Sequence, residues 1–289
     1  MSKQLIPERL YNFNIQKFIT AAIAEDVGDG DHTSLACIPS SANGKAHLLV
    51  KENGILAGVE LAKEIFKTVD KSLKINVFLN DGSKIKVGDV VLTVAGKSQS
   101  ILLAERLVLN CMQRMSGIAT KTNHLVELCK GTKTKVIDTR KTTPLIRGLE
   151  KWAVVLGGGA NHRIGLYDMI LIKDNHIDYA GGIQQAIDAS KKYLKAKNKK
   201  LKIEVEARNL DEVKEILSIG RINRIMLDNF SIADIKKAIK LIDGKYETEA
   251  SGGITEQNIS KYAKCGVDFI SVGALTHHIK SLDLSLKAI

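Results

Sequence analysis

The sequence predicts an α/β protein in which a closed or nearly closed barrel of alternating strands and helices follows a separate α+β layer. From Lys135 onward a unit repeats: a short apolar strand, a polar residue at its end, and a helix with an N-cap. Such alternation with short connections indicates a parallel sheet wound right-handedly. No G-x-G-x-x-G motif follows a strand, which disfavours a dinucleotide-binding open sheet and favours the barrel.

The first 115 residues lack this repeat and predict the separate α+β layer. Helical patterns over 15–25 and 58–70 flank three strands. The strands are predicted at 46–51, 73–79 and 90–95, with turn signals at 80–82 and 97–98. A helix over 100–115, apolar on one side, then leads through Ser116-Gly117 to the barrel.

Six apolar runs in the second part are typical of buried parallel strands. They are Val136–Asp138, Met169–Ile172, Lys202–Glu206, Arg224–Leu227, Tyr246–Ala250 and Asp268–Val272. The helices between them carry their own signals. Asn209 with Glu212, and Ser231 with Asp234, have the spacing of N-cap and N3 residues, and glycines at 220, 244 and 266 stand where helices should stop.

The composition indicates a soluble, cytoplasmic protein. The chain has 289 residues, is 44% hydrophobic, has no apolar run long enough for a membrane helix, and shows no secretion-signal pattern at its N-terminus. Four scattered cysteines suggest core thiols rather than disulfides or a zinc site. The net charge of +11 owes much to seven lysines between 191 and 202, on what we expect to be a solvated helix face. With 4% aromatics, nucleic-acid binding is disfavoured.

Cations at the predicted strand ends indicate a pocket for an anion with several charges. Functional groups of barrel enzymes lie at the C-terminal ends of the strands. Arg140 and Lys141 follow the first strand, and Lys173 follows the second. His162 and Arg163 come after the glycine run 157–159, and beside the other cations they are candidates to bind a carboxylate.

Two acidic strand ends and two glycine-containing ends predict the rest of the site. Glu206 and Asp228 could hold Mg²⁺ or a sugar diol, whereas Glu204 could equally form an internal salt bridge with one of the lysines. Small residues after the last two strands could cradle a phosphate at a helix start, or could simply be turn residues. They are Ser251, Gly252, Gly253, Gly273 and Ala274.

Several motifs together resemble quinolinate phosphoribosyltransferase (nicotinate-nucleotide pyrophosphorylase, carboxylating). These are EDVGDGDHTS, LLAERLVLNCMQRMSGIAT, DTRKTTP, EKWAVVLGGGANHRIGLYDMILIKDNHI, EVE, MLDNF, EASGGI and SVGALTH, in order along nearly the whole chain. The resemblance implies an incomplete (β/α) barrel with an N-terminal α+β open-sandwich domain. It also implies domains at 1–116 and 117–274, with a C-terminal helix over 275–289 that packs back on the first domain.

The resemblance further implies a reaction and a role for each site residue. Quinolinate and phosphoribosyl pyrophosphate would react, with Mg²⁺, to give nicotinate mononucleotide, pyrophosphate and CO₂ in NAD biosynthesis. The quinolinate carboxylates would be held by Arg140, His162, Arg163 and Lys173, joined by Arg106 from the second subunit of a homodimer. Lys141, Glu206 and Asp228 would be catalytic, the last two also holding the metal, while residues 251–253 and 273–274 would bind the 5′-phosphate.

Two alternatives remain open at this stage. One is a paralogue of the same family that is linked to metal uptake and uses a different acceptor. The other is a non-catalytic protein that binds anions or nucleic acid, which the acidic pair Glu206 and Asp228 disfavours because carboxylates repel nucleic acid.

Overall fold

A computed structural model describes residues 13–289 of the chain, which divide into two compact units. The N-terminal unit contains the chain up to Asn123, together with 142–158 and 274–289. The sheet unit contains 124–141 and 159–273. Each unit is therefore built from segments that are separated in sequence.

The sheet unit is built on six parallel strands, as the alternation of apolar runs and caps predicts. The strands are β6 (Lys135–Ile137), β7 (Ile170–Ile172), β8 (Ile203–Ala207), β9 (Arg224–Asp228), β10 (Glu247–Ser251) and β11 (Phe269–Ser271). They lie in the order β6-β11-β10-β9-β8-β7, every pair parallel. Because β6 and β7 form the two edges of this sheet in the described residues, the barrel is incomplete, as expected.

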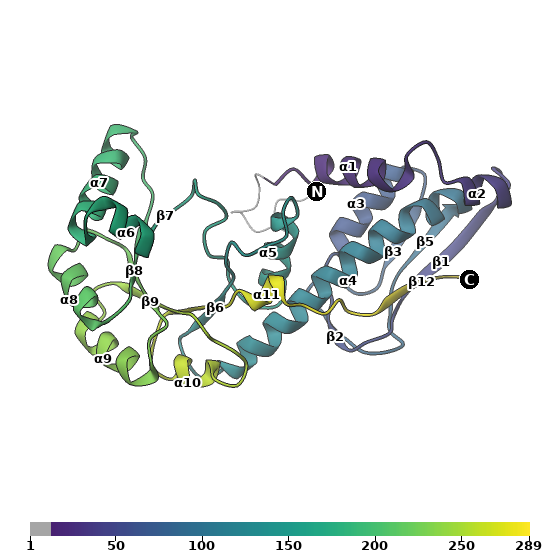
Figure 1. The fold of residues 1–289 in the computed structure, drawn as a ribbon. Helices are drawn as coiled ribbons and strands as arrows, with labels where there is room; N and C mark the ends of the chain where they lie inside the picture. Colours follow the sequence, from purple (N-terminus) through teal and green to yellow (C-terminus); the bar gives the residue numbers. More distant parts are fainter. Residues whose placement is uncertain (1–12) are drawn as a thin grey trace. The chain divides into compact units, whose positions relative to one another are not determined.

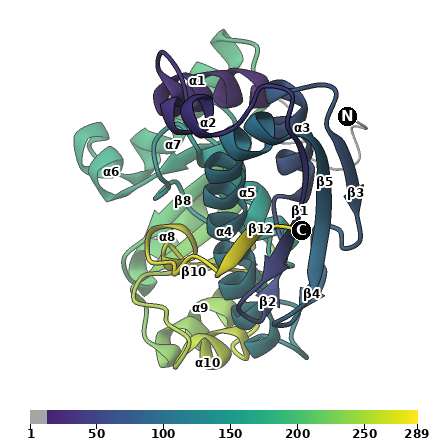
Figure 2. The same cartoon turned by 90° about the vertical axis from the view of Figure 1, so that its right-hand side faces the viewer.

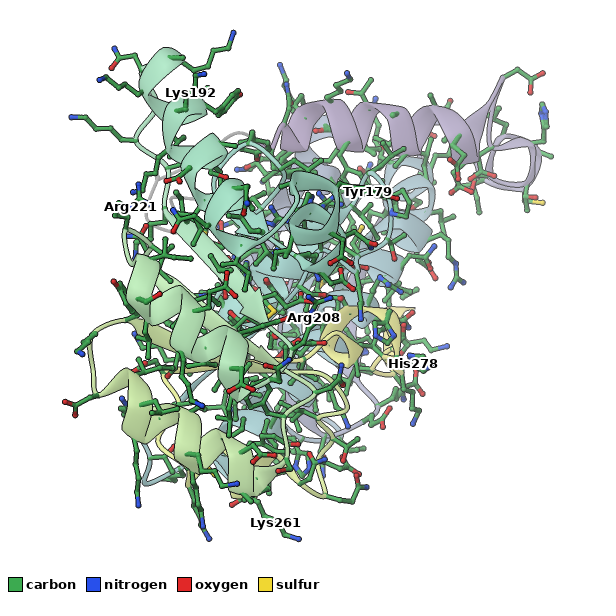
Figure 3. The ribbon with its side chains drawn as sticks, turned by 60° about the vertical axis from the view of Figure 1, so that its left-hand side comes forward. Tyr179, Lys192, Arg208, Arg221, Lys261 and His278 are labelled. Carbon is green, nitrogen blue, oxygen red and sulfur yellow. The ribbon has the colours of Figure 1, made fainter. Side chains whose placement is uncertain are left out.

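Helices cover the outer side of this sheet (Figure 1). They are α6 (Asp174–Ala180), α7 (Ile183–Ala196), α8 (Leu210–Ile219), α9 (Ile232–Ile242) and α10 (Ile259–Ala263). The predicted caps are confirmed: Asn209 accepts from the N–H groups of Asp211 and Glu212, and Ser231 accepts from that of Asp234. The lysines of α7 are exposed, and Lys192 points into solvent (Figure 3).

The N-terminal unit has an antiparallel sheet in the order β12-β1-β5-β3 (Figure 2). Its strands are β1 (Asn43–Val50), β3 (Lys74–Val77), β5 (Val90–Lys97) and β12 (Leu284–Ala288), and β2 (Gly54–Ile55) pairs separately with β4 (Lys84–Ile85). Its helices are α1 (Ile15–Val27), α2 (His32–Cys37), α3 (Val59–Val69), α5 (Arg147–Leu156), α11 (Ala274–His277) and most of α4 (Ser98–Leu128). Helices packed on one antiparallel sheet give the predicted open sandwich.

The prediction that a helix ends before Ser116-Gly117 is wrong, because α4 continues without a break to Leu128. These two residues serve packing. The Ser116 hydroxyl accepts from the N–H of Ala57 at 2.9 Å, and a Cβ on Gly117 would come within 2.2 Å of the Lys280 carbonyl oxygen. A small residue inside a helix therefore marks a close approach of another segment here, and not a helix end.

The predicted C-terminal helix over 275–289 is also wrong. Only Ala274–His277 is helical, and Leu284–Ala288 forms β12, which pairs with β1. Leu284 and Leu286 are buried on either side of the partly exposed Ser285, which is the period of a strand with one face on a core. The segment does belong to the N-terminal unit, but as an edge strand of its sheet.

Two further expectations concern cysteines and membranes. All four cysteines are free, and Cys111 and Cys129 are buried as predicted, whereas Cys37 is exposed and Cys265 is half-buried, so these last two are not core thiols. Within residues 13–289, no helix combines the length and the apolar character needed to cross a membrane.

Candidate functional site

The predicted cations lie at the C-terminal ends of the two edge strands of the sheet unit. Arg140 and Lys141 come shortly after β6, and both are exposed. Lys173 follows β7 directly and is the N-cap residue of α6. Its Nζ lies 3.1 Å from Oε2 of Glu206, so a cation from β7 and a carboxylate from β8 meet at this edge of the sheet.

The loop that carries His162 and Arg163 is tied to the end of β6. Ala160 forms an isolated parallel bridge with Ile137. Asp138 is fully buried, and its carboxylate accepts from Asn161 Nδ2 at 2.6 Å and from the His162 N–H at 3.0 Å. The main chain at His162 is therefore held in place independently of the contacts of its ring.

The Arg163 guanidinium lies in a setting that favours a bound anion. The residue is 7% exposed, and its Nη1 donates to the Met169 carbonyl at 3.2 Å. Burial lowers the pKa of Arg163, and the nearby charge of Arg140 lowers it further. Two cations that disfavour each other in this way would both be stabilised by a shared anion.

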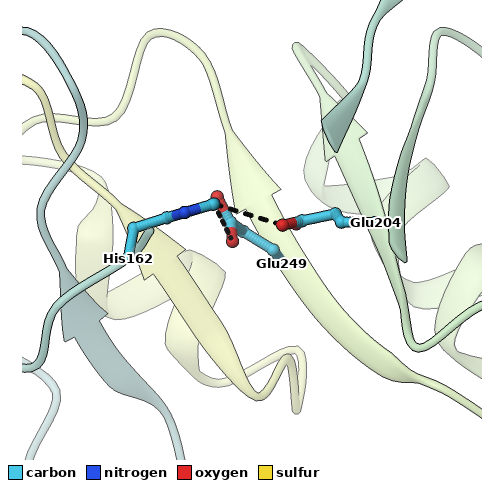
Figure 4. Close-up of side chains that lie close together, drawn as sticks. All are labelled: His162, Glu204 and Glu249. Carbon is cyan, nitrogen blue, oxygen red and sulfur yellow. Dashed lines mark ion pairs between the residues drawn. The ribbon is translucent and has the colours of Figure 1, made fainter. Parts of the chain in front are cut away.

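A buried ion cluster surrounds the His162 ring (Figure 4). The His162 Nε2 is 3.2 Å from Oε2 of Glu204, on β8, and 3.3 Å from Oε2 of Glu249, on β10. Arg224 of β9 adds Nη1, which lies 3.0 Å from Glu249 and 3.8 Å from Glu204, and its guanidinium stacks on the Phe269 ring at 3.8 Å. Glu204 therefore forms internal ion pairs, but with His162 and Arg224 and not with a lysine as one of its two open interpretations had it.

Burial and neighbouring charges shift the carboxyl groups of the cluster in opposite directions. Burial raises the pKa of Glu204, and the facing charge of Glu249 raises it further. Burial also acts to raise the pKa of Glu249, but contacts with His162 and Arg224 lower it more, so that its pKa lies below the usual value. Glu249 is thus a carboxylate paired with Arg224, whereas the carboxyl group of Glu204 favours sharing a proton with His162.

The hydrogen bonds of His162 assign its tautomer. Burial lowers its pKa, but hydrogen bonds to Glu204 and Glu249 raise it more, to about 9. A cationic ring would carry a second proton on Nδ1, yet Nδ1 accepts from the Arg163 N–H at 2.6 Å. Because a backbone amide can only donate, the geometry favours the neutral ring with its hydrogen on Nε2.

The same tautomer argues against a metal ion in this cluster, although His162, Glu204 and Glu249 offer ligand atoms within 4.8 Å of one another. A metal needs the Nε2 lone pair, and in the tautomer that the Arg163 contact favours, that atom carries the hydrogen. Arg224 also supplies a positive charge beside both carboxylates, so a divalent cation would meet a repelling neighbour.

The carboxylates predicted to be catalytic end two neighbouring strands. Glu206 is 5% exposed and lies near the end of β8, while Asp228 is the half-buried last residue of β9. Asn229 follows with φ +56° and donates from Nδ2 to Asp228 at 2.6 Å. Its N–H donates to the Ser251 carbonyl at 2.8 Å, which links this turn to the end of β10.

The glycines after β10 form a tight turn. Gly252 has φ +88°, and a Cβ there would lie 2.2 Å from Asn229 Oδ1. Gly253 has φ +59°, and no atom lies within 4 Å of the position that a Cβ would take, so its outer side is open. The expectation that this turn leads straight into a helix is wrong, since α10 begins only at Ile259. Gly273 does precede a short helix, α11, which starts at Ala274 in the N-terminal unit.

The sheet unit thus contains every predicted site residue except Arg106 and Ala274. Arg106 is exposed on α4 in the N-terminal unit. Sequence reasoning missed Glu249, Arg224, Asp138 and Asn229. A usable signal existed for the first two, because a charged residue within a predicted buried strand needs a partner of opposite charge.

Comparison with known families agrees with this arrangement. The family model described as "Quinolinate phosphoribosyl transferase, N-terminal domain" matches residues 31–116, and that described as "Quinolinate phosphoribosyl transferase, C-terminal domain" matches residues 118–287. Together the two models cover most of the chain.

Curated relatives and solved structures carry corresponding names. The chain is 46% identical to the chloroplastic nicotinate-nucleotide pyrophosphorylase [carboxylating] of Arabidopsis thaliana, over 95% of this chain and 83% of the relative. It is 40% identical to the probable enzyme of that name from Bacillus subtilis, over 95% and 93%. The nicotinate-nucleotide pyrophosphorylase structure from Francisella tularensis superposes with a TM-score of 0.90 at 41% identity, covering 98% of each chain.

Proposed function

The chain belongs to the quinolinate phosphoribosyltransferase family, and we propose that its sheet unit is the site of the decarboxylating reaction for which the family is named. In this reaction quinolinate and phosphoribosyl pyrophosphate give nicotinate mononucleotide, pyrophosphate and CO₂, a step of NAD biosynthesis. The observation that carries the proposal is the combination of mutually repelling cations, Arg140 and Arg163, with carboxylates at the ends of strands of the same sheet.

The cations suit the dicarboxylate. Quinolinate and a polyphosphate repel each other, so the site must supply positive charge before the two can meet. Arg140, His162, Arg163 and Lys173 would hold the two carboxylates of quinolinate. Lys141, next along the chain from Arg140, would lie between quinolinate and the pyrophosphate. Lys173 pairs with Glu206 at 3.1 Å, so it would exchange that partner for the substrate or share it.

The carboxylates suit the sugar. An oxocarbenium-like transition state develops positive charge at the anomeric carbon, and Glu206 and Asp228 would stabilise it and bind the ribose hydroxyls. Their oxygen atoms are also the hard ligands that Mg²⁺ prefers, and Mg²⁺ is commonly held by one or two carboxylates together with substrate phosphates. When bound, Mg²⁺ would supply positive charge to the pyrophosphate that departs.

The small residues suit the 5′-phosphate. The open side of Gly253 and the positive φ of both turn glycines leave room for backbone N–H groups to approach an anion. Ser251, Gly252 and Gly253 would form one side of this cradle, and Gly273 with Ala274 the other. Because α11 is only four residues long, its N-terminus lacks the positive end of a long helix, so the contacts would be mainly with single N–H groups.

Arg106 would complete the pocket from a second subunit of a homodimer, whose N-terminal unit would cover the partner's sheet unit. The side chain of Arg106 is exposed and available for such a contact. The cytoplasmic location expected from the sequence stays a prediction, and the names of plant relatives place those proteins in chloroplasts or mitochondria.

A turnover assay tests the proposal. The purified chain, given quinolinate, phosphoribosyl pyrophosphate and Mg²⁺, should release CO₂ and pyrophosphate in equal amounts and form nicotinate mononucleotide. Removal of Mg²⁺ with a chelator should abolish turnover, and added Mg²⁺ should restore it. Turnover with another pyridine acceptor and none with quinolinate would overturn the proposal.

A further inference from the structure

Three neighbouring strands of the sheet unit contribute charged side chains to one buried cluster. Glu204, Arg224 and Glu249 come from β8, β9 and β10, and Glu204 stands opposite Arg224 in the strand register. Both carboxylates are fully buried. The single guanidinium of Arg224 contacts both, at 3.8 Å and 3.0 Å. One cation between two carboxylates leaves them able to attract a further hydrogen-bond donor.

The His162 ring lies against both carboxylates and also contacts the main chain of Arg163. Its Nε2 points between Glu204 and Glu249 (Figure 4), at 3.2 and 3.3 Å. Its Nδ1 accepts from the main-chain N–H of Arg163 at 2.6 Å. Both ring nitrogens thus face protein atoms, although Nε2 has no partner of hydrogen-bond geometry in the described residues. Together with the Asp138 contact to the His162 N–H, the orientation of the ring helps to fix the main chain of Arg163.

We infer that Glu204 and Glu249 are positioning residues for the dicarboxylate, acting through His162 on Arg163. The inference rests on the proposed function, since it assigns Arg163 to quinolinate. The Arg163 guanidinium donates from Nη1 to Met169 at 3.2 Å and is attracted by the charges of Glu204 and Asp168, but burial and the charge of Arg140 outweigh that attraction. A guanidinium held beside another cation needs a rigid backbone to keep its place, and the His162 contact provides it.

Stability alone does not account for such a cluster. Replacing a buried ion cluster with apolar side chains of similar volume is often neutral or stabilising. Here both carboxylate oxygens of Glu204 are buried without a hydrogen-bond partner in the described residues, which makes its burial more costly. Through His162 the cluster contacts the main chain of Arg163, and Glu249 also contacts the side chain of Ser271 at the end of β11.

Steady-state kinetics with each substrate varied separately test this role. Glu204→Gln and Glu249→Gln keep the shape of the side chain and weaken its attraction for the Nε2 hydrogen. Each should raise KM for quinolinate about tenfold, because the His162 ring would lose one of the two charge contacts that hold it. KM for phosphoribosyl pyrophosphate should change less than about twofold. The wild-type enzyme measured alongside tests the proposed function itself, so a failure of that function is distinguishable from a failure of this role.

Glu247→Gln is the matched control. Glu247 lies on β10 as Glu249 does and pairs with the same Arg224, at 3.3 Å, but its other ion pair is with Lys202 and not with His162. Its substitution should leave both KM values unchanged. Thermal unfolding of the three variants then reports how much each contributes to stability independently of substrate binding.

A double-mutant cycle decides whether the effect passes through Arg163. In an Arg163→Ala background, Glu204→Gln should cause no further loss in kcat/KM for quinolinate, because the group that it positions is absent. Multiplicative losses, or equal changes in both KM values, would overturn the inference. Failure of Glu204→Gln and Glu249→Gln to fold, with Glu247→Gln intact, would also overturn it by making the cluster purely structural.

Discussion

At the scale of single residues, the main feature is the concentration of positive charge around Arg163. Burial and the charge of Arg140 both lower its pKa, so the folded protein holds two guanidinium groups in mutual repulsion. Such an arrangement becomes favourable when an anion with two carboxylates binds. If Arg163 binds the dicarboxylate as proposed, the loop that carries it would hold the guanidinium in position before the substrate arrives.

Arg163→Ala should lower kcat/KM for quinolinate by roughly two to three orders of magnitude. The physical reason is that an unpaired buried carboxylate costs about 3–4 kcal/mol. Initial-rate measurements at varied quinolinate check this. Arg221→Gln is the control, because it removes an exposed ion pair with Asp188 of α7 and should have no effect. A loss below about threefold would remove Arg163 from the site.

At the scale of elements, the turns after β9 and β10 determine the shape of the proposed phosphate cradle. Asn229 and Gly252 both have positive φ, and the Asn229 N–H bonds to Ser251. The two turns are therefore packed against each other, and neither can change without moving the other. This coupling places Asp228 and the glycines of residues 252–253 at one edge of the sheet.

Gly252→Ala should raise KM for phosphoribosyl pyrophosphate by about tenfold or more, because its Cβ would lie 2.2 Å from Asn229 Oδ1 and would displace the turn. Gly244→Ala is the control, since Gly244 also has positive φ, +70°, but nothing within 4 Å of the added Cβ. Both variants should lose about 1 kcal/mol of stability from the left-handed backbone. Equal KM values in the two variants would contradict the proposed cradle.

The edge strand β12 carries a second prediction at this scale. Leu286 is 7% exposed and faces the core of the N-terminal unit, opposite Leu48 in the register. Leu286→Ala should reduce the free energy of unfolding by about 2–4 kcal/mol, through lost apolar burial and the cavity left behind. Lys287→Ala, on the exposed face of the same strand, should have little effect. Urea unfolding followed by circular dichroism distinguishes the two, and similar midpoints would argue against β12.

At the scale of the whole molecule, Arg106 and most of the other predicted site residues belong to different units of the chain. The chain passes repeatedly between its two units, so that segments 142–158 and 274–289 return to the N-terminal unit. Arg106 stays on α4, outside the sheet unit. A homodimer in which each N-terminal unit serves the partner's sheet unit would bring this arginine to the site.

Hybrid dimers test that arrangement. Arg106→Ala and Glu206→Gln chains, each inactive alone, should regain about a quarter of wild-type activity when unfolded and refolded together in equal amounts, because half of the dimers are hybrids with one intact site of two. The control mixes Arg163→Ala with Glu206→Gln chains, which both alter the sheet unit and should regain nothing. Absence of recovery in the first mixture would argue against a shared site.

Much of the fold was predictable because its signals are local. Apolar runs and the caps at Asn209 and Ser231 lie within a few residues of the elements that they define. The errors at Ser116-Gly117 and at 284–288 have a different origin. In both, the deciding neighbour is far away in sequence: the Lys280 carbonyl against Gly117, and β1 against β12.

The sequence by itself determined the family, the parallel strands and the strand-end residues from Arg140 to Ala274. Periodicity and motifs depend only on residues that are close together in the sequence. Only the tertiary structure decided how Glu204 is used. Its neighbours His162, Arg224 and Glu249 come from separate segments of the chain. Because Glu204 is buried, its charge must be balanced by groups of the protein and not by water. A charge excluded from water must find its partner in space, and spatial proximity across strands leaves no local pattern in the sequence.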